Sequence, residues 1–213
     1  MWDLIERGGP IIWPLILTSI LTFTVILERS LFLLRLKLKQ SPDKREHFHL
    51  LLSEGRLNEA VSLAKVSNDP VLQVVFESFH QKREAFSIRY QKKARTLLGS
   101  IHRGVPILDT AITIAPLLGL LGTVVGLIHS FYSIGESSIT APIAITGGIS
   151  EALIATAFGL GIAIVALIPY NVLNEIEEKT REELEILGNN IEELLNKQEN
   201  HDGEKQRKDI TLV

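Results

Sequence analysis

Cysteine is absent from the 213-residue chain, so neither disulfide bonds nor thiolate metal sites can contribute to its fold. The formal net charge is only −3, which is too small to indicate nucleic acid as a partner. The charged loop near the middle of the chain has no phosphate-binding glycine motif and no strand pattern. Its His47 and His49 are better explained by a solvated loop than by a metal pair.

Three long apolar stretches are separated from the charged parts of the chain. Mean hydropathy is +0.21, although 22% of the residues are charged. The uncharged part of the first stretch, 8–27, has about the 20 residues that cross ~30 Å of hydrocarbon. Its start is not basic, so we interpret it as an uncleaved anchor rather than a signal peptide. The second and third stretches, 111–132 and 143–173, predict a membrane hairpin with a short external turn.

Lysine and arginine are distributed unevenly between the segments that join these stretches. Fourteen of them lie between Arg35 and Arg103, six lie after Leu173, and none lies in the turn at 134–142. The positive-inside rule then places the long loop and the tail in the cytoplasm. The amino terminus and the short turn are expected on the outer, periplasmic side.

The cytoplasmic segments have the pattern of helices. Asp69-Pro70 is a cap residue followed by a proline that suits the first helical turn, and Ser53-Glu54-Gly55 indicates a break between two shorter helices. A basic helix from Phe86 to Ile107 is expected to run straight into the second span. Residues 174–196 predict an amphipathic helix that continues the third span. Its narrow apolar seam suits packing against the loop helices or against copies of itself, and comprises Leu173, Ile176, Thr180, Leu184, Leu187, Ile191 and Leu194.

The predicted fold is therefore an all-α membrane protein with three transmembrane helices and long cytoplasmic helical extensions. Its expected segments are a periplasmic amino terminus with the first span (1–34), a cytoplasmic loop (35–110), the second span (111–133), a periplasmic turn (134–142), the third span (143–173), an amphipathic helix (174–196) and a disordered tail (197–213).

One carboxylate lies inside the third apolar stretch. Glu151 is the only charged residue between 143 and 173. A charge within a membrane helix costs ~2.5 kcal/mol or more. Glu151 is therefore expected to face a partner, a polar cavity or an ion path, and not lipid.

Small residues form a stripe along each helix of the hairpin, at spacings of three and four. In lipid, such stripes allow close backbone approach and drive helix association. Hairpin packing explains part of this pattern but not the presence of Glu151, Thr123 and Thr156 beside it. The stripes comprise Ala115, Gly119, Gly122, Gly126 and Ser130 in the second span, and Gly148, Ala152, Ala155, Gly159, Ala163 and Ala166 in the third.

The two spans contain the segments 115–131 (APLLGLLGTVVGLIHSF), 148–160 (GISEALIATAFGL) and 168–171 (IPYN). Together these segments resemble the ExbB/TolQ branch of the MotA/TolQ/ExbB proton-channel family. Glu28-Arg29 after the first span also resembles this branch. The resemblance covers roughly residues 1–195, and MotA itself, with four spans, fits less well.

The resemblance implies a proton-channel or stator subunit, not an enzyme, in a multi-pass complex of the bacterial inner membrane. A pentameric ring would surround two copies of a single-span ExbD/TolR-like partner and use the proton motive force for outer-membrane import or envelope maintenance, with a TonB/TolA-like protein as a further partner. Glu151, Thr123 and Thr156 would line the proton path. No catalytic residue, cofactor or metal is expected, and sodium remains open as the coupling ion. The alternative is an oligomeric membrane scaffold without ion conduction.

Other residues carry weaker expectations. Gly119, Gly122, Gly126 and Gly159 are expected to serve helix packing, and Pro116 and Pro169 to bend their helices. His129 is interpreted first as a hydrogen-bonded helix contact. Glu28 and Arg29 are interpreted as an anchor at the inner membrane face, where Arg29 can reach lipid headgroups.

Overall fold

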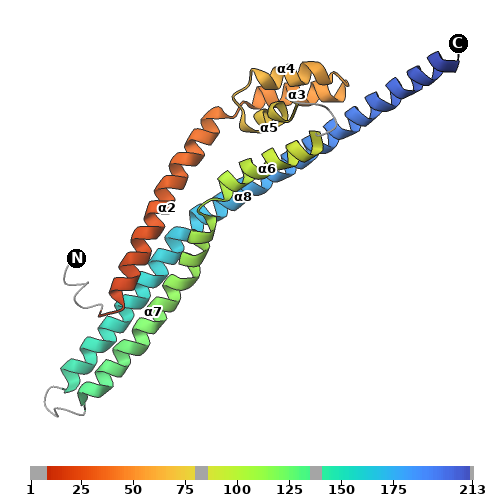
Figure 1. Cartoon of the computed structure of the whole chain (residues 1–213). Helices are drawn as coiled ribbons and strands as arrows, with labels where there is room; N and C mark the ends of the chain where they lie inside the picture. The colour runs from red at the N-terminus through yellow and green to blue at the C-terminus, as the bar shows by residue number, and fades with distance from the viewer. Residues whose placement is uncertain (1–8, 80–85, 135–140, 212–213) are drawn as a thin grey trace. The chain divides into compact units, whose positions relative to one another are not determined.

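The computed structural model describes the backbone of residues 9–79, 86–134 and 141–211, and the surroundings of side chains in 9–79, 86–132 and 146–198 (Figure 1). Helices joined by short turns make up these residues, and no strand occurs among them. The helices are α2 (Ile12–Lys39), α3 (Pro42–Ser53), α4 (Leu57–Lys65), α5 (Pro70–Phe79), α6 (Phe86–His102), α7 (Val105–Ile134) and α8 (Ala141–Thr211).

Three helical stretches among the described residues are long and apolar enough to cross a membrane. They are Ile12–Lys39, Phe86–Tyr132 and Thr146–Gln198. The three predicted spans are therefore confirmed as apolar helices of sufficient length. The short turn of the predicted hairpin falls mostly on 135–140, which lies outside the described residues.

The chain divides into two compact units. The first, called here the membrane unit, comprises Met1–Phe32 and Arg103–Asn174. The second comprises Leu33–His102 and Glu175–Val213, and is called the cytoplasmic unit after the location expected for it from the sequence. Each unit has its own core of buried apolar residues.

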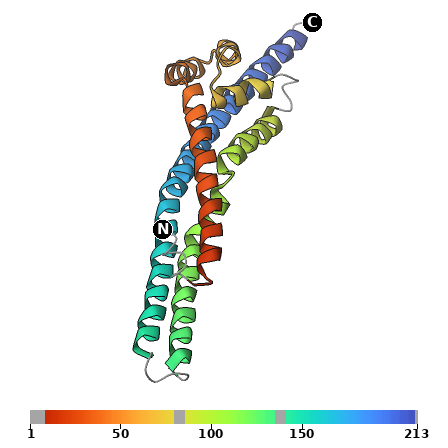
Figure 2. The same ribbon diagram turned by 90° about the vertical axis from the view of Figure 1, so that its left-hand side faces the viewer.

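In the membrane unit, α7 and the first half of α8 lie side by side, and the first part of α2 packs against them (Figure 2). Leu15 of α2 is fully buried against Ala115 of α7 and Ala155 of α8. Many larger apolar side chains of these helices are exposed instead, among them Leu117, Leu120, Leu153 and Ile164. The helices thus bury their small residues and leave their large ones outside, as suits a unit surrounded by lipid or by other helices.

The cytoplasmic unit has a core of large apolar side chains. Phe48 of α3, Leu72 of α5 and Leu187 of α8 are almost completely buried, and so is Ile191. The seam of α8 therefore packs against the loop helices, one of the two partners that its spacing indicated. The predicted break at Ser53-Glu54-Gly55 is confirmed, because α3 ends at Ser53 and Gly55 has a φ of +73°.

A buried carboxylate connects three segments of this unit. Asp69, fully buried, accepts hydrogen bonds from the amides of Val71 (2.9 Å) and Ser41 (2.9 Å), which confirms its predicted role as a cap of α5. Arg45 Nε donates to the same carboxylate at 2.8 Å, and Arg45 Nη1 donates to Glu183 of α8 at 2.5 Å. Burial raises the pKa of Glu183 above its ordinary value, with the nearby Asp69 adding to this effect and Arg45 opposing it.

Two predicted boundaries are wrong. The basic helix does not continue into the second span: α6 ends at His102, and α7 begins at Val105 after Gly104, whose φ is +90°. Glycine at a helix end and Pro106 in the next first turn favour this break. The tail expected to be disordered after Asn196 is helical to Thr211. Pairs four residues apart, such as Lys197 with Glu193 at 2.6 Å, favour continuation of the helix.

Candidate functional site

Glu151 lies half-buried on α8, facing the residues that precede α2. The structure brings its carboxylate against the backbone of Gly9, because a Cβ built on Gly9 would lie 1.3 Å from Glu151 Oε1. Gly9 has a φ of +64°, which glycine adopts without strain. The charged group of the third span is thus level with the beginning of the first span.

The two threonines predicted beside Glu151 make different contacts. Thr156 Oγ1 donates a hydrogen bond of 3.1 Å to the backbone carbonyl of Gly119 on α7. Thr123 Oγ1 donates to Leu120 within its own helix at 2.6 Å. Within the part of the chain that the structure describes, no hydrogen bond joins Glu151 to either threonine. Among the described residues of one copy, the three predicted path residues are therefore not linked to one another by the hydrogen bonds of their side chains.

Thr156 can reach across to α7 because the helices approach so closely there. A Cβ built on Gly119 would lie 3.0 Å from Thr156 Cα, and one built on Gly159 would lie 2.3 Å from the carbonyl oxygen of Ala115. Cβ atoms built on Gly122 and Gly126 would also be crowded, 2.4 Å from Ala155 Cβ and 2.8 Å from the Gly148 carbonyl oxygen. All four glycines are buried, as a packing role within the hairpin requires, and that role stays a prediction.

Arg29 is buried at the beginning of α7 rather than extended outward. Only 3% of its surface is exposed, and its Cδ would lie 3.1 Å from a Cβ built on Gly104. Its guanidinium donates to Glu28 at 2.6 Å and lies 4.9 Å from the centre of the Phe32 ring. The interpretation as a headgroup anchor does not hold for Arg29, because Gly104 provides a surface for its aliphatic stem.

The sequence profile of the MotA/TolQ/ExbB proton channel family matches residues 63–186, more than half of the chain. The chain belongs to this family. An ExbB-like biopolymer transport protein of Synechocystis is 33% identical over 192 residues, which cover 87% of this chain and 75% of the relative. The biopolymer transport protein ExbB of Neisseria meningitidis is 28% identical over 216 residues (91% and 96%). The Tol-Pal system protein TolQ of Haemophilus influenzae is 29% identical over 174 residues (75% and 76%).

Membership of the MotA/TolQ/ExbB family confirms the predicted resemblance and its ExbB/TolQ branch. It supports a membrane protein that acts as a proton-channel subunit in energy transduction. The matched range contains Thr123, Glu151 and Thr156, whereas Gly9 and Arg29 lie before it.

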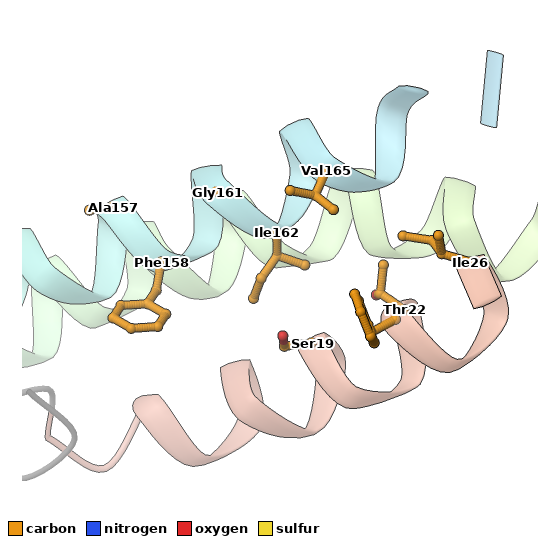
Figure 3. Close-up of a pocket in the computed structure, with 9 residues that line it drawn as sticks. Ser19, Thr22, Ile26, Ala157, Phe158, Gly161, Ile162 and Val165 are labelled. Carbon is orange, nitrogen blue, oxygen red and sulfur yellow. The ribbon is translucent and has the colours of Figure 1, made fainter. Parts of the chain in front are cut away.

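Within this member of the family, an apolar groove lies between α2 and α8 (Figure 3). Its volume is about 510 Å³. Ser19, Thr22 and Ile26 of α2 line one side, and Phe158, Ile162 and Val165 of α8 line the other. Thr22 Oγ1 donates to the carbonyl of Thr18 in its own helix, so its hydroxyl is already bonded. The groove has no ionisable lining residue, and Glu151 is not part of it.

The remaining predicted residues lie at separate positions on α7 and α8. His129 is exposed on α7 near the carboxyl end of that helix. Pro116 lies inside α7 and Pro169 inside α8, and both helices continue through their prolines. Sequence reasoning missed Gly9 and Gly104. The available signals were a Gly-Gly-Pro run before the first span and a glycine two residues before Pro106, both typical of a chain that changes direction.

Proposed function

We propose that this chain forms the membrane ring of a proton-driven motor, with Glu151 as the group that exchanges the proton. The observation that carries this proposal is a carboxylate in the otherwise apolar part of α8, half-buried against the Gly9 backbone and without an ion pair to a basic side chain among the described residues. A charge in that place is costly, and intramembrane ionisable residues mark ion pathways more often than structure.

The energetics suit such a role. A proton that crosses a potential of 100 mV releases ~2.3 kcal/mol, and a protein uses this energy through a narrow path of polar groups in an apolar surround. The hairpin supplies the apolar surround through its tightly packed small residues. Thr156 and Thr123 supply hydroxyls, which both donate and accept hydrogen bonds.

The proposal includes a ring of five copies in the bacterial inner membrane, around two copies of an ExbD/TolR-like single-span partner. The amino terminus faces the periplasm, and the tail of α8 faces the cytoplasm. Protons are the coupling ion, and the force serves outer-membrane import or envelope maintenance. Support comes from the family and from the relatives named ExbB and TolQ.

The first test is the composition of the complex. Gentle purification of the tagged chain from its own membranes, followed by native mass spectrometry, should give five copies with two of a small one-span protein. A lone oligomer that survives the mildest detergents, or one bound only to soluble proteins, would contradict the proposal and favour a scaffold.

The second test is proton flux through that complex in liposomes under an imposed potential. Glu151→Gln keeps the shape of the side chain and removes its charge, so flux should be abolished while the complex still assembles. Thr156→Val should also abolish flux, since valine replaces the hydroxyl with a methyl group. Thr24→Val is the matched control, because the exposed Thr24 hydroxyl bonds only to its own helix. Full flux in Glu151→Gln would overturn the proposed function, whatever Thr156→Val does.

A further inference from the structure

Gly9 and Glu151 meet although 141 positions separate them in the sequence and the family profile covers only one of them. A Cβ built on Gly9 would lie 1.3 Å from Oε1, 2.4 Å from Cδ and 3.1 Å from Cγ of Glu151. The whole end of the glutamate side chain therefore occupies the space that any other residue at position 9 would fill.

We propose that Gly9 is a positioning residue for Glu151. The backbone before α2, which carries no side chain at this position, forms the surface that the carboxylate contacts. This inference deepens the proposed function and rests on it, because it concerns the same carboxylate. It adds the beginning of the first span to the ion-handling site.

The backbone at Gly9 is held in place by the packing of the residues that follow it. The amide of Ile12 donates to the Gly9 carbonyl at 3.2 Å, and Ile12 and Leu15 are almost completely buried. Ile11 approaches Gly122 of α7, where a Cβ would lie 3.6 Å from Ile11 Cγ2. The backbone at Gly9 is thus tied to α7, while Glu151 reaches it from α8.

Glycine meets two separate requirements at this position. The φ of +64° would strain any residue with a Cβ, and the contact with Glu151 leaves no room for one. At Gly55 only the first requirement applies, because its φ is +73° and a Cβ built on it would meet nothing within 4 Å. Gly55→Ala therefore measures backbone strain alone, and Gly9→Ala measures strain together with displacement of the carboxylate.

The contact can be tested by cross-linking, because the chain has no cysteine of its own. The Gly9→Cys and Glu151→Cys pair should form a disulfide within one chain under mild oxidation, since Glu151 Cγ lies 3.1 Å from the Cβ position of residue 9. Gly9→Cys with Gly161→Cys is the control, because position 161 lies about 15 Å further along α8. Absence of the first disulfide, or its formation only between two chains, would overturn the inference.

The functional test uses proton flux through the purified complex in liposomes. Gly9→Ala should lower flux by about tenfold or more, since a displacement of about 1 Å at a reacting group can cost as much. Gly55→Ala should stay within about twofold of the unaltered chain, because its strain lies away from the carboxylate.

Rescue distinguishes positioning from a general loss of structure. Glu151→Asp withdraws the carboxylate by one carbon–carbon bond and makes room for the methyl group that Gly9→Ala adds. The double variant Gly9→Ala with Glu151→Asp should therefore conduct at least about threefold faster than Gly9→Ala alone. No gain would overturn the inference.

The two proposals fail in different ways. Full flux in Glu151→Gln would remove the proposed function whatever Gly9→Ala does. Abolished flux in Glu151→Gln, together with equal flux in Gly9→Ala and Gly55→Ala, would leave the proposed function standing and overturn the role of Gly9.

Discussion

The membrane unit and the cytoplasmic unit are built by opposite means from the same type of secondary structure. In the membrane hairpin the helices approach each other most closely at glycines, which have no side chain, as at Gly159 against the Ala115 carbonyl. The cytoplasmic unit is tight where side chains are large, as at Phe48 and Leu187, and it buries the charge of Asp69. Water makes burial of large apolar groups favourable, whereas lipid does not, so helices in lipid gain mainly from close backbone contact. The two units should therefore respond differently to the addition and removal of single groups.

The largest effect is expected from removing a group in the cytoplasmic unit. Asp69→Ala should lower the free energy of opening of α3–α5 by about 3 kcal/mol or more, because it leaves two amides without their acceptor and removes a buried partner of Arg45. Hydrogen exchange of these helices, measured in the intact complex in nanodiscs, checks the value.

Glu59→Ala is the control for that change. Glu59 also binds an arginine, Arg56, but both side chains are more than half exposed. Its loss should leave hydrogen exchange unaltered. Equal effects of the two substitutions would mean that Asp69 is not a structural centre of the unit.

A smaller effect is expected from adding a group in the membrane unit. Gly159→Ala should destabilise the hairpin by about 1–3 kcal/mol, because the new methyl group would lie 2.3 Å from the Ala115 carbonyl oxygen and must separate α7 from α8. Gly161→Ala, two residues along the same helix, meets nothing within 4 Å and should stabilise α8 slightly. Opposite changes in the detergent resistance of the two variants would support this difference between the units, and changes in the same direction would contradict it.

The smallest effect concerns the pH dependence of the cytoplasmic unit. Because burial raises the pKa of Glu183, its contribution to stability is full below the ordinary glutamate pKa of about 4.3 and is lost as pH rises through the raised value. Glu183→Gln should remove this pH dependence and change the opening free energy by less than about 1 kcal/mol at pH 7. Hydrogen exchange at several pH values checks it, with the exposed Glu182→Gln as control. If the opening free energy of Glu183→Gln still depends on pH, another group causes that dependence.

Sequence reasoning was sufficient where one local pattern decides the structure. Hydropathy located the three spans, Asp69-Pro70 predicted the beginning of α5, and the glycine spacing predicted the hairpin contact. It could not predict that Glu151 rests on Gly9, because that contact depends on how two distant helices pack. It also missed the break at Gly104, since a continuous apolar and basic pattern hides a single residue with positive φ.

The glycine contacts of the hairpin fall into two kinds, which limit substitution in different ways. Gly122 faces the Cβ of Ala155, so a larger residue on α7 can be compensated by a smaller one on α8, and these two positions are free to vary together. Gly159 faces the backbone carbonyl of Ala115, and no substitution at position 115 removes that carbonyl. Among homologous sequences, position 159 should therefore stay fixed and show no correlated partner, while 122 and 155 change as a pair.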